Sequence, residues 1–359
     1  MDLGGVARVS VQYLRDFCTE ALEATGVPAD AAGIVADSLV QADACGLSSH
    51  GAVRLLPIHV RRLQSGATRP RPDLKVVAGR GQVKLLDADA GLGQVAGHRA
   101  MDMAVSMARA SGIGLVGVRN SSHFGFGAFF VQQAVGHGMI GIALTNASPN
   151  MPPAGGARPF LGTNPMAIGV PCKEELPVVL DMSTSVVARG RIVMAQLAGE
   201  EIPVGWALDS DGLPTQDASA ALEGSVLPVG GYKGSGLSLM VDVLCGVLTG
   251  AAFGPHVTDF YDQSGRAQNL GHMFAAVDVE SFMPVPTFTR LMDQMVREVR
   301  AQPLQPGVER IFLPGEIEQL CLQKSRQEGI PISAAGIREL DSLASELAVR
   351  PLAESLSEP

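Results

Sequence analysis

The chain has 359 residues, of which 46% are hydrophobic and 18% charged, so disorder is excluded as its main state and two domains with an ample core are possible. A net charge of −9, one tryptophan and three tyrosines argue against nucleic-acid binding. The five cysteines include no CxxC pair, which argues against a disulfide framework and against a metal site. No secretory leader and no long uncharged apolar segment is seen, so we expect a cytoplasmic protein without a membrane span.

Hydrophobic periodicity predicts two helices within residues 8–45, separated by a turn at 26–28. Ser49 is expected to cap a third helix that ends at Gly66, and this start would place His50 and Arg54 four residues apart on one helix face. Further helices are predicted at 97–110, 127–136, 237–248 and 287–300 and from 316 onward, and strands at 81–87, 112–118, 139–146, 166–170, 178–182 and 273–277. We expect the 237–248 helix to be buried. The segment 148–165, rich in Pro, Gly and Asn, is a candidate functional loop.

Two serine–histidine pairs stand in loop-forming contexts. Ser49-His50 lies in residues 46–51, with Arg54 four residues after the histidine, and Ser122-His123 lies in residues 120–125. A histidine can move a proton near neutral pH, an adjacent hydroxyl can orient its ring, and an arginine can bind a carboxylate through two parallel donors. Together these residues predict proton delivery to a small acid. The alternative for each pair alone is a helix cap.

Three glycine-rich segments call for separate interpretations. Residues 112–117 match G-x-G-x-x-G, but the expected order is helix, glycines, strand, which is the reverse of a dinucleotide fingerprint. Residues 91–97 have the right context but a misplaced third glycine and no acidic residue at the required distance, so the sequence argues against a Rossmann domain. Residues 230–236 contain Lys233 and precede a helix; they predict either an anion site or a flexible turn.

Seven motifs in chain order resemble the malate/L-lactate dehydrogenase family of NAD(P)-dependent oxidoreductases, from about Val9 to Pro331. They lie at residues 42–54, 120–125, 162–165, 180–185, 231–234, 269–272 and 313–316. The resemblance implies an α/β (α+β), non-Rossmann NAD(P)-binding fold. A large mixed-sheet α/β domain would span residues 76–284, and a mainly helical domain would combine both chain termini, 1–75 and 285–359. It also implies a homodimer.

The resemblance further implies roles for individual residues. His50 matches the proton donor or acceptor, with Ser49 as its relay partner, and Arg54 matches a contact to the substrate carboxylate. His123 matches a position that faces cofactor and substrate, to which some members assign the proton transfer. Cofactor contacts are implied for His123, Phe124, Gly125, Thr145, Asp181, Met182, Ser183, Lys233, Leu313, Pro314 and Gly315. Ile317 and Tyr232 depart from the residues that many relatives carry, so NAD and NADP both stay open.

The expected activity is hydride transfer between a nicotinamide and a small 2-hydroxy or 2-oxo acid of the malate or lactate type. His50 is the better candidate for the base because Ser49 and Arg54 are its neighbours in sequence; His123 is the second. Alternatives on the same scaffold are a ureidoglycolate or sulfolactate dehydrogenase and a cyclic imino-acid reductase. An alternative of another class is a non-catalytic binding protein.

Overall fold

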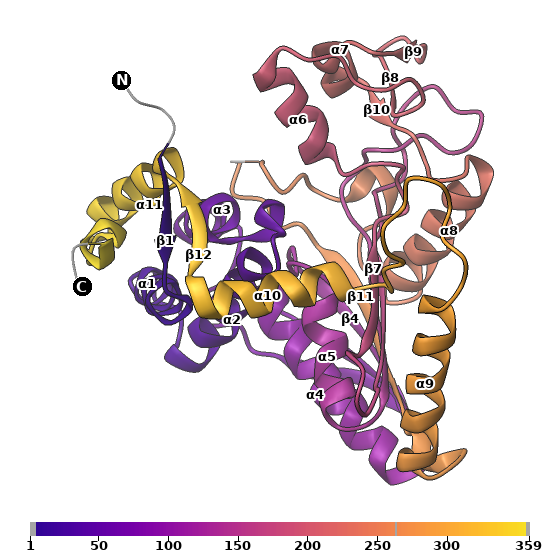
Figure 1. Cartoon of the computed structure of the whole chain (residues 1–359). Coiled ribbons are helices and arrows are strands. Elements are labelled where there is room, and N and C mark those ends of the chain that lie inside the picture. Colours follow the sequence, from indigo (N-terminus) through magenta and orange to yellow (C-terminus); the bar gives the residue numbers. More distant parts are fainter. Residues whose placement is uncertain (1–4, 263, 357–359) are drawn as a thin grey trace.

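The computed structural model describes residues 5–262 and 264–356, and its elements form a helical part beside a large sheet (Figure 1). The helical part contains α1 (Val11–Glu23), α2 (Ala29–Ala44), α3 (Ala52–Gln64), α10 (Glu316–Glu328) and α11 (Ala334–Leu347). A short antiparallel pair, β1 (Val6–Val9) with β12 (Ile330–Ser333), joins the two ends of the chain. Both strands fall outside the sequence prediction, which assigned helix from residue 8 and throughout the C-terminal region.

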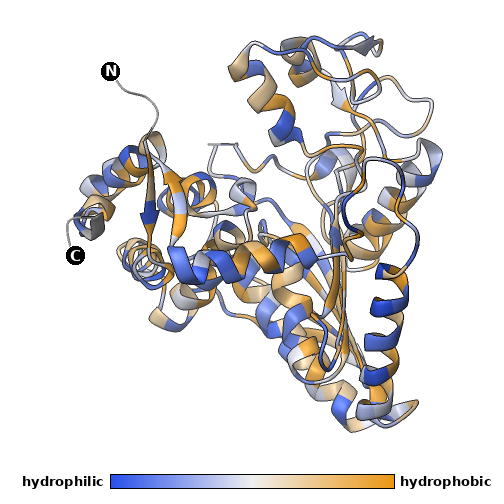
Figure 2. Cartoon of the chain, in the orientation of Figure 1, coloured by the Kyte–Doolittle hydropathy of each residue, from blue (hydrophilic) through white to orange (hydrophobic). Residues whose placement is uncertain are grey.

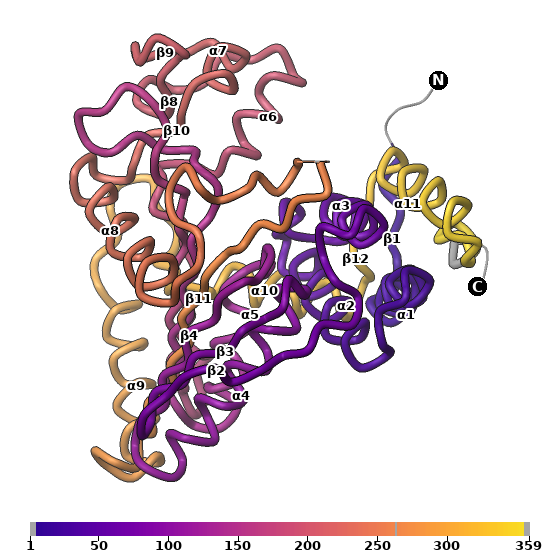
Figure 3. Tube along the Cα trace, turned by 180° about the vertical axis from the view of Figure 1, so that it is seen from behind, coloured from indigo at the N-terminus to yellow at the C-terminus, as the bar shows by residue number. Residues whose placement is uncertain are grey.

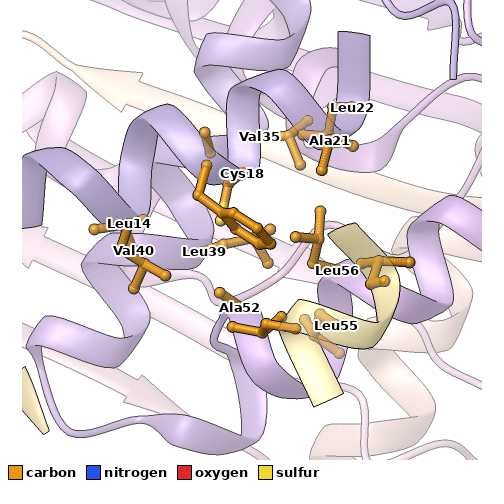
Figure 4. Packing of buried hydrophobic residues seen from close by; sticks show 14 of the residues in the cluster. Leu14, Cys18, Ala21, Leu22, Val35, Leu39, Val40, Ala52, Leu55 and Leu56 are labelled. Atoms are coloured by element: carbon orange, nitrogen blue, oxygen red, sulfur yellow. The ribbon is translucent and has the colours of Figure 1, made fainter. Parts of the chain in front are cut away.

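Apolar side chains from α1, α2 and α3 form the core of the helical part (Figure 4). Leu14, Leu22, Leu39 and Leu56 are completely inaccessible to solvent. Burial of such a side chain stabilises the fold by about 1.5–3 kcal/mol. Helix α1 begins where Ser10 accepts a hydrogen bond from the backbone N–H of Tyr13. The packing fixes α3, which carries candidate site residues, against α1 and α2.

The large sheet has seven strands in the order β2-β3-β4-β11-β5-β6-β7. Their bounds are β2 (Lys75–Arg80), β3 (Val83–Asp87), β4 (Ile113–Ser121), β5 (Ile140–Thr145), β6 (Met166–Val170), β7 (Val178–Met182) and β11 (Leu270–Val277). Only β3 and β4 run parallel; the other neighbouring strands are antiparallel. A Rossmann sheet is parallel, so the predicted mixed-sheet, non-Rossmann fold is confirmed.

Helices cover both faces of this sheet. Helices α4 (Gly93–Ser111) and α5 (Ala128–Gly136) lie on one face, and α8 (Tyr232–Asp242) with its π-helical continuation η2 (Val243–Val247) lies on the other (Figures 1 and 3). Helix α9 (Val285–Arg300) runs along the outside and is largely hydrophilic, whereas the strands are mainly hydrophobic (Figure 2). Gly112 ends α4 in a left-handed conformation, and Gly114 and Gly117 lie inside β4. The predicted order of helix, glycines and strand is therefore confirmed.

A small third unit stands above the sheet in Figure 1. It contains α6 (Arg189–Ala198), α7 (Ala218–Glu223) and a three-stranded sheet of β8 (Ala207–Leu208), β9 (Pro214–Thr215) and β10 (Ser225–Val226). Its own core includes Ile192, Ile202 and Val226. Short helices elsewhere are η1 (Ser48–His50), η3 (Gly254–His256), η4 (Val279–Ser281) and η5 (Leu352–Leu356). None of the elements of this unit was predicted from the sequence. Strands β8, β9 and β10 have two residues each and α7 has six, and α6 buries only Ile192, so no periodic apolar face marks it.

Two helix predictions are wrong in ways that matter for the site. Helix α3 begins at Ala52, with Gly51 as its N-cap, because residues 48–50 form a separate 3₁₀ turn. The expected buried helix begins at Tyr232, and its outer side chains, Leu237, Met240, Leu244 and Leu248, are 38–64% exposed. The division into two domains stays a prediction; the hydrogen bonds of α9 at Asp293 and Arg297 join it to residues 173–175 of the sheet part.

Within the described residues, no helix is both long and apolar enough to cross a membrane.

Candidate active site

A cavity of about 1110 Å³ lies between the helical part, the large sheet and the small unit. Most of the predicted site residues line it: Ser49, His50, Arg54, His123, Gly125, Asp181, Met182, Ser183, Leu313, Pro314 and Gly315. These residues come from segments up to 266 positions apart in the chain, so the fold and not the local sequence brings them together. Phe124, Thr145 and Lys233 do not line the cavity.

The partly buried carboxylate of Asp43 on α2 fixes the turn that carries His50. The backbone N–H of Ala52 donates to Asp43 Oδ2 at 2.7 Å, so Asp43 satisfies a free donor at the start of α3. A Cβ on Gly51 would lie 1.8 Å from Asp43 Oδ1, so only glycine allows this approach. Burial raises the pKa of Asp43 to about 7, although the Ala52 N–H opposes the shift. Arg54 therefore lies in the first turn of α3, and His50 lies just before it.

His50 contacts Ser49, its expected relay partner, and His123, the second candidate for the base. Its Nδ1 lies 2.9 Å from Ser49 Oγ, and its ring stacks on the ring of His123 with 5.9 Å between centroids and 19° between planes. Burial lowers the pKa of His50 to about 4, and the nearby positive charge of Arg54 lowers it further. His50 is therefore neutral at pH 7 in the free protein.

His123 follows the end of β4 and is held from two sides. The backbone N–H of Gly125 donates to the ring nitrogen Nδ1 of His123 at 3.2 Å. The backbone N–H of His123 donates to Gln268 Oε1 at 2.9 Å. Because Nδ1 accepts a hydrogen bond, the neutral ring carries its proton on Nε2. Burial holds the pKa of His123 well below its usual range, with a further contribution from His50. In this state His123 is a hydrogen-bond donor.

Two aromatic neighbours of these groups were not predicted from the sequence. Phe260 stacks on the ring of His123 with 4.6 Å between centroids, and the Tyr261 hydroxyl accepts a hydrogen bond from Arg54 Nη2 at 2.7 Å. Both aromatic residues line the cavity. They lie in a loop between η3 and β11, where hydrophobic periodicity gives no signal. One available signal was that Tyr261 is one of only three tyrosines in the chain.

The opposite wall is built from β7, the start of α5 and the segment before α10. Asp181 Oδ2 accepts a hydrogen bond from the N–H of Ala128 at 2.8 Å, and burial raises the pKa of Asp181 to about 6. The N–H of Val179 donates to Pro314 O at 3.0 Å. Gly315 has φ +81°, and a Cβ there would lie 2.7 Å from Val179 O, so this approach also requires glycine. The segment 313–315 is thereby held against β7.

The three remaining predicted residues have other surroundings. Phe124 is buried and stacks on His272 at 5.0 Å, and Thr145 Oγ1 lies 2.7 Å from His272 Nδ1. Lys233 is exposed at the start of α8. Cofactor binding by these residues stays a prediction. In residues 5–262 and 264–356 no group of three His, Cys, Asp or Glu side chains is arranged to hold a metal ion.

Comparison with known proteins adds an independent finding. Residues 9–341 match the family model described as malate/L-lactate dehydrogenase. The chain belongs to the malate/L-lactate dehydrogenase family. It is 39% identical to a malate dehydrogenase of Pyrococcus abyssi over 353 residues, which cover 96% of both chains. It is 37% identical to an L-sulfolactate dehydrogenase of Methanothermobacter thermautotrophicus, over 95% of this chain and 97% of the relative.

A solved structure of a relative shows that the fold is shared as well. The structure of malate dehydrogenase from Pyrococcus horikoshii superposes with a TM-score of 0.89 at 36% identity, covering 96% of this chain and 97% of the other. The family resemblance predicted from the motifs is confirmed. The chain is accordingly an NAD(P)-dependent oxidoreductase that acts on a CH–OH group.

Proposed function

We propose that the protein interconverts a small 2-hydroxy acid of the malate or lactate type and the corresponding 2-oxo acid. The observation that carries the proposal is the convergence of His50, His123 and Arg54 on one cavity. A guanidinium binds a carboxylate through parallel hydrogen bonds, and a neutral histidine can accept the hydroxyl proton. A 2-hydroxy acid reacts at the carbon next to its carboxylate, so its site needs a carboxylate-binding group and a proton acceptor close together.

The two histidines have different parts in this proposal. His123 Nδ1 is occupied by the N–H of Gly125, so neutral His123 offers Nε2–H as a donor to the substrate oxygen. His50 can instead carry its proton on Nδ1, directed at Ser49 Oγ, which leaves Nε2 free to accept. In the oxidation direction His50 takes the hydroxyl proton, and in reduction it returns the proton to the 2-oxo oxygen. Ser49 orients the ring throughout.

The electrostatics of the cavity link substrate binding to proton transfer. Arg54 lowers the pKa of His50 in the free protein. A substrate carboxylate bound at Arg54 would compensate that positive charge and raise the pKa of His50 toward neutrality. His50 would then exchange a proton most readily when the acid is in place.

The cavity fits a nicotinamide cofactor together with a small acid. Its volume of about 1110 Å³ slightly exceeds the usual range for ligand pockets, which is about 300–1,000 Å³. Asp181, Met182, Ser183 and the segment 313–315 form a wall that would hold the cofactor, which supplies hydride chemistry when bound. We propose NAD or NADP, and a fluorescence titration with each reduced form would identify the preferred one.

We also propose a cytoplasmic homodimer. All five cysteines are free, as expected in a reducing compartment. The apolar side chains Leu237, Met240, Leu244 and Leu248 on α8 and η2 form an exposed face, and a second copy of the chain would cover it. Light scattering should give twice the chain mass for the parent protein and a smaller mass for Met240→Asp. A monomeric parent protein would contradict the dimer.

One spectrophotometric panel tests the activity. Oxidation of NADH and NADPH would be followed with pyruvate, oxaloacetate, sulfopyruvate and a cyclic imine, and reduction of NAD and NADP with ureidoglycolate. We expect the highest kcat/KM with a 2-oxo acid. Preference for ureidoglycolate or the imine would instead support those alternatives on the same scaffold. Absence of turnover with every substrate, combined with cofactor binding, would support a non-catalytic binding protein.

A further inference from the structure

The segment 257–262 brings two aromatic rings to the reactive groups. Phe260 stacks on His123 with 25° between the ring planes, and Tyr261 packs edge-on against Phe260 with 5.6 Å between centroids. The Arg54 guanidinium lies 5.9 Å from the centre of the Tyr261 ring and donates to its hydroxyl. One short segment therefore contacts both a candidate catalytic histidine and the arginine expected to bind the carboxylate.

A buried arginine holds this segment in place. Arg62, only 3% exposed, donates to the carbonyl oxygens of Phe260 at 3.3 Å, Asp262 at 3.2 Å and Arg266 at 3.0 Å. Hydrogen bonds from a charged donor are stronger than neutral ones, and three of them limit the movement of the backbone. Arg62 and Arg54 both lie on α3. Helix α3 thus fixes the position of Tyr261 relative to Arg54.

The Tyr261 hydroxyl has one hydrogen left to donate. Its oxygen accepts from Arg54, whereas its own O–H finds no acceptor within the part of the chain that the structure describes. A phenol can accept and donate at the same time. Tyr261 is 55% exposed and lines the same cavity as Arg54, so an anion bound at Arg54 could accept from this O–H in place of solvent.

We propose that Tyr261 is a substrate-binding residue that donates its O–H to the carboxylate held by Arg54. This rests on the proposed function, in which Arg54 binds a 2-hydroxy or 2-oxo acid. Arg54 then donates parallel N–H groups to the two oxygens of the carboxylate, and Tyr261 adds an O–H donor to one of these oxygens. An amide analogue presents an N–H₂ group where the second oxygen would be, which leaves a donor facing a donor. Tyr261 therefore selects acids over the corresponding amides.

Tyr261→Phe tests the proposal because it removes only the hydroxyl. KM for the best 2-oxo acid should rise about tenfold, as expected for loss of one hydrogen bond to a charged group, with little change in kcat. The preference for the acid over its amide should fall by the same factor. Tyr13→Phe is a matched control, since the Tyr13 hydroxyl donates to Pro351 O in the helical part, away from the cavity.

Arg62→Lys gives a second measurement. Lysine lacks the planar set of donors that spans three carbonyl oxygens, so the segment should lose its fixed position and KM should rise. Because the change acts through Tyr261, it should raise KM much less in a protein that already carries Tyr261→Phe. Full additivity of the two changes would show that Arg62 does not act through Tyr261.

The outcomes separate this inference from the proposed function. If Tyr261→Phe keeps the parent KM and the parent preference for acid over amide, while Arg54→Lys raises KM, Tyr261 does not bind the substrate and the proposed function stands. If Arg54→Lys also keeps the parent KM, or if no 2-oxo acid is turned over by the parent protein, the proposed function itself fails.

Discussion

The carboxylate of Glu316 allows a test of how the segment 313–315, which is proposed to contact the cofactor, is held in place. It is 2% exposed and accepts hydrogen bonds from Arg300 at 3.1 Å, from Arg310 and from the N–H of Leu313 at 3.1 Å. Leu313 begins the segment that lines the cavity. Glu316→Gln preserves the shape of the side chain but removes its negative charge and turns one acceptor into a donor. We expect the segment 309–315 to loosen and cofactor affinity to fall.

The size of the effect follows from the burial of the partners. Breaking a fully buried ion pair costs about 3–5 kcal/mol. The Arg300 and Arg310 side chains are 28% and 47% exposed, and Arg300 keeps its contact with Glu175, so solvent and the second carboxylate reduce that figure. We expect a loss of about 2 kcal/mol, which limits the weakening of cofactor binding to about thirtyfold. We therefore expect Glu316→Gln to weaken cofactor binding between about threefold and about thirtyfold.

Fluorescence titration with the reduced cofactor measures the affinity, and hydrogen exchange measures the opening of residues 309–315. Glu174→Gln is the matched control, because Glu174 pairs with Arg297 on the surface and is 64% exposed. Exposed ion pairs contribute about 0–1 kcal/mol, so the control should change neither measurement appreciably. Unchanged affinity and unchanged exchange in Glu316→Gln would refute the reasoning and leave the contact of Pro314 with Val179 as the main anchor.

Three further predictions concern the proton and the cofactor. His50→Ala should lower turnover by about two to four orders of magnitude with little change in the cofactor dissociation constant; turnover within about threefold of the parent would move the base to His123. Lys233→Ala should weaken cofactor binding at low salt and less at high salt, and an unchanged dissociation constant at low salt would remove Lys233 from the site. Oxidation requires neutral His50, whose pKa is lowered to about 4, so kcat/KM should fall as the pH drops through about 4 and not near 6.5.

The sequence was sufficient for the family, and most of the site residues predicted from it line the cavity. Local motifs predicted Ser49, His50, Arg54 and His123 because serine–histidine pairs are rare enough to stand out. The five-residue strands 166–170 and 178–182 were predicted with the bounds that the structure shows, since their apolar runs end at polar or proline residues. The predicted fold class follows from the motifs jointly and not from any one of them.

The features that could not be predicted from the sequence depend on contacts between distant segments. The start of α3 was misplaced because Ser49 resembles an N-cap, whereas Asp43 from α2 accepts the hydrogen bond at the actual start. The helix after Gly231 was expected to be buried because its residues are apolar. In the single chain, however, several of its apolar side chains are exposed to solvent. The contact of Tyr261 with Arg54 also joins distant segments, because folding places the Tyr261 hydroxyl 2.7 Å from Arg54 Nη2.

If Arg54 binds the substrate as proposed, its position would favour an acid over a neutral alcohol as the partner of the two histidines. In the free protein the histidines are neutral, since burial and the nearby positive charge both disfavour protonation. A carboxylate at Arg54 removes part of that penalty, so it binds more tightly as His50 gains a proton, and the proton binds more tightly when the carboxylate is present. A neutral alcohol makes no such contribution. We therefore expect selectivity for the acid to have two sources, its binding at Arg54 and the raised pKa of His50 when the acid is bound.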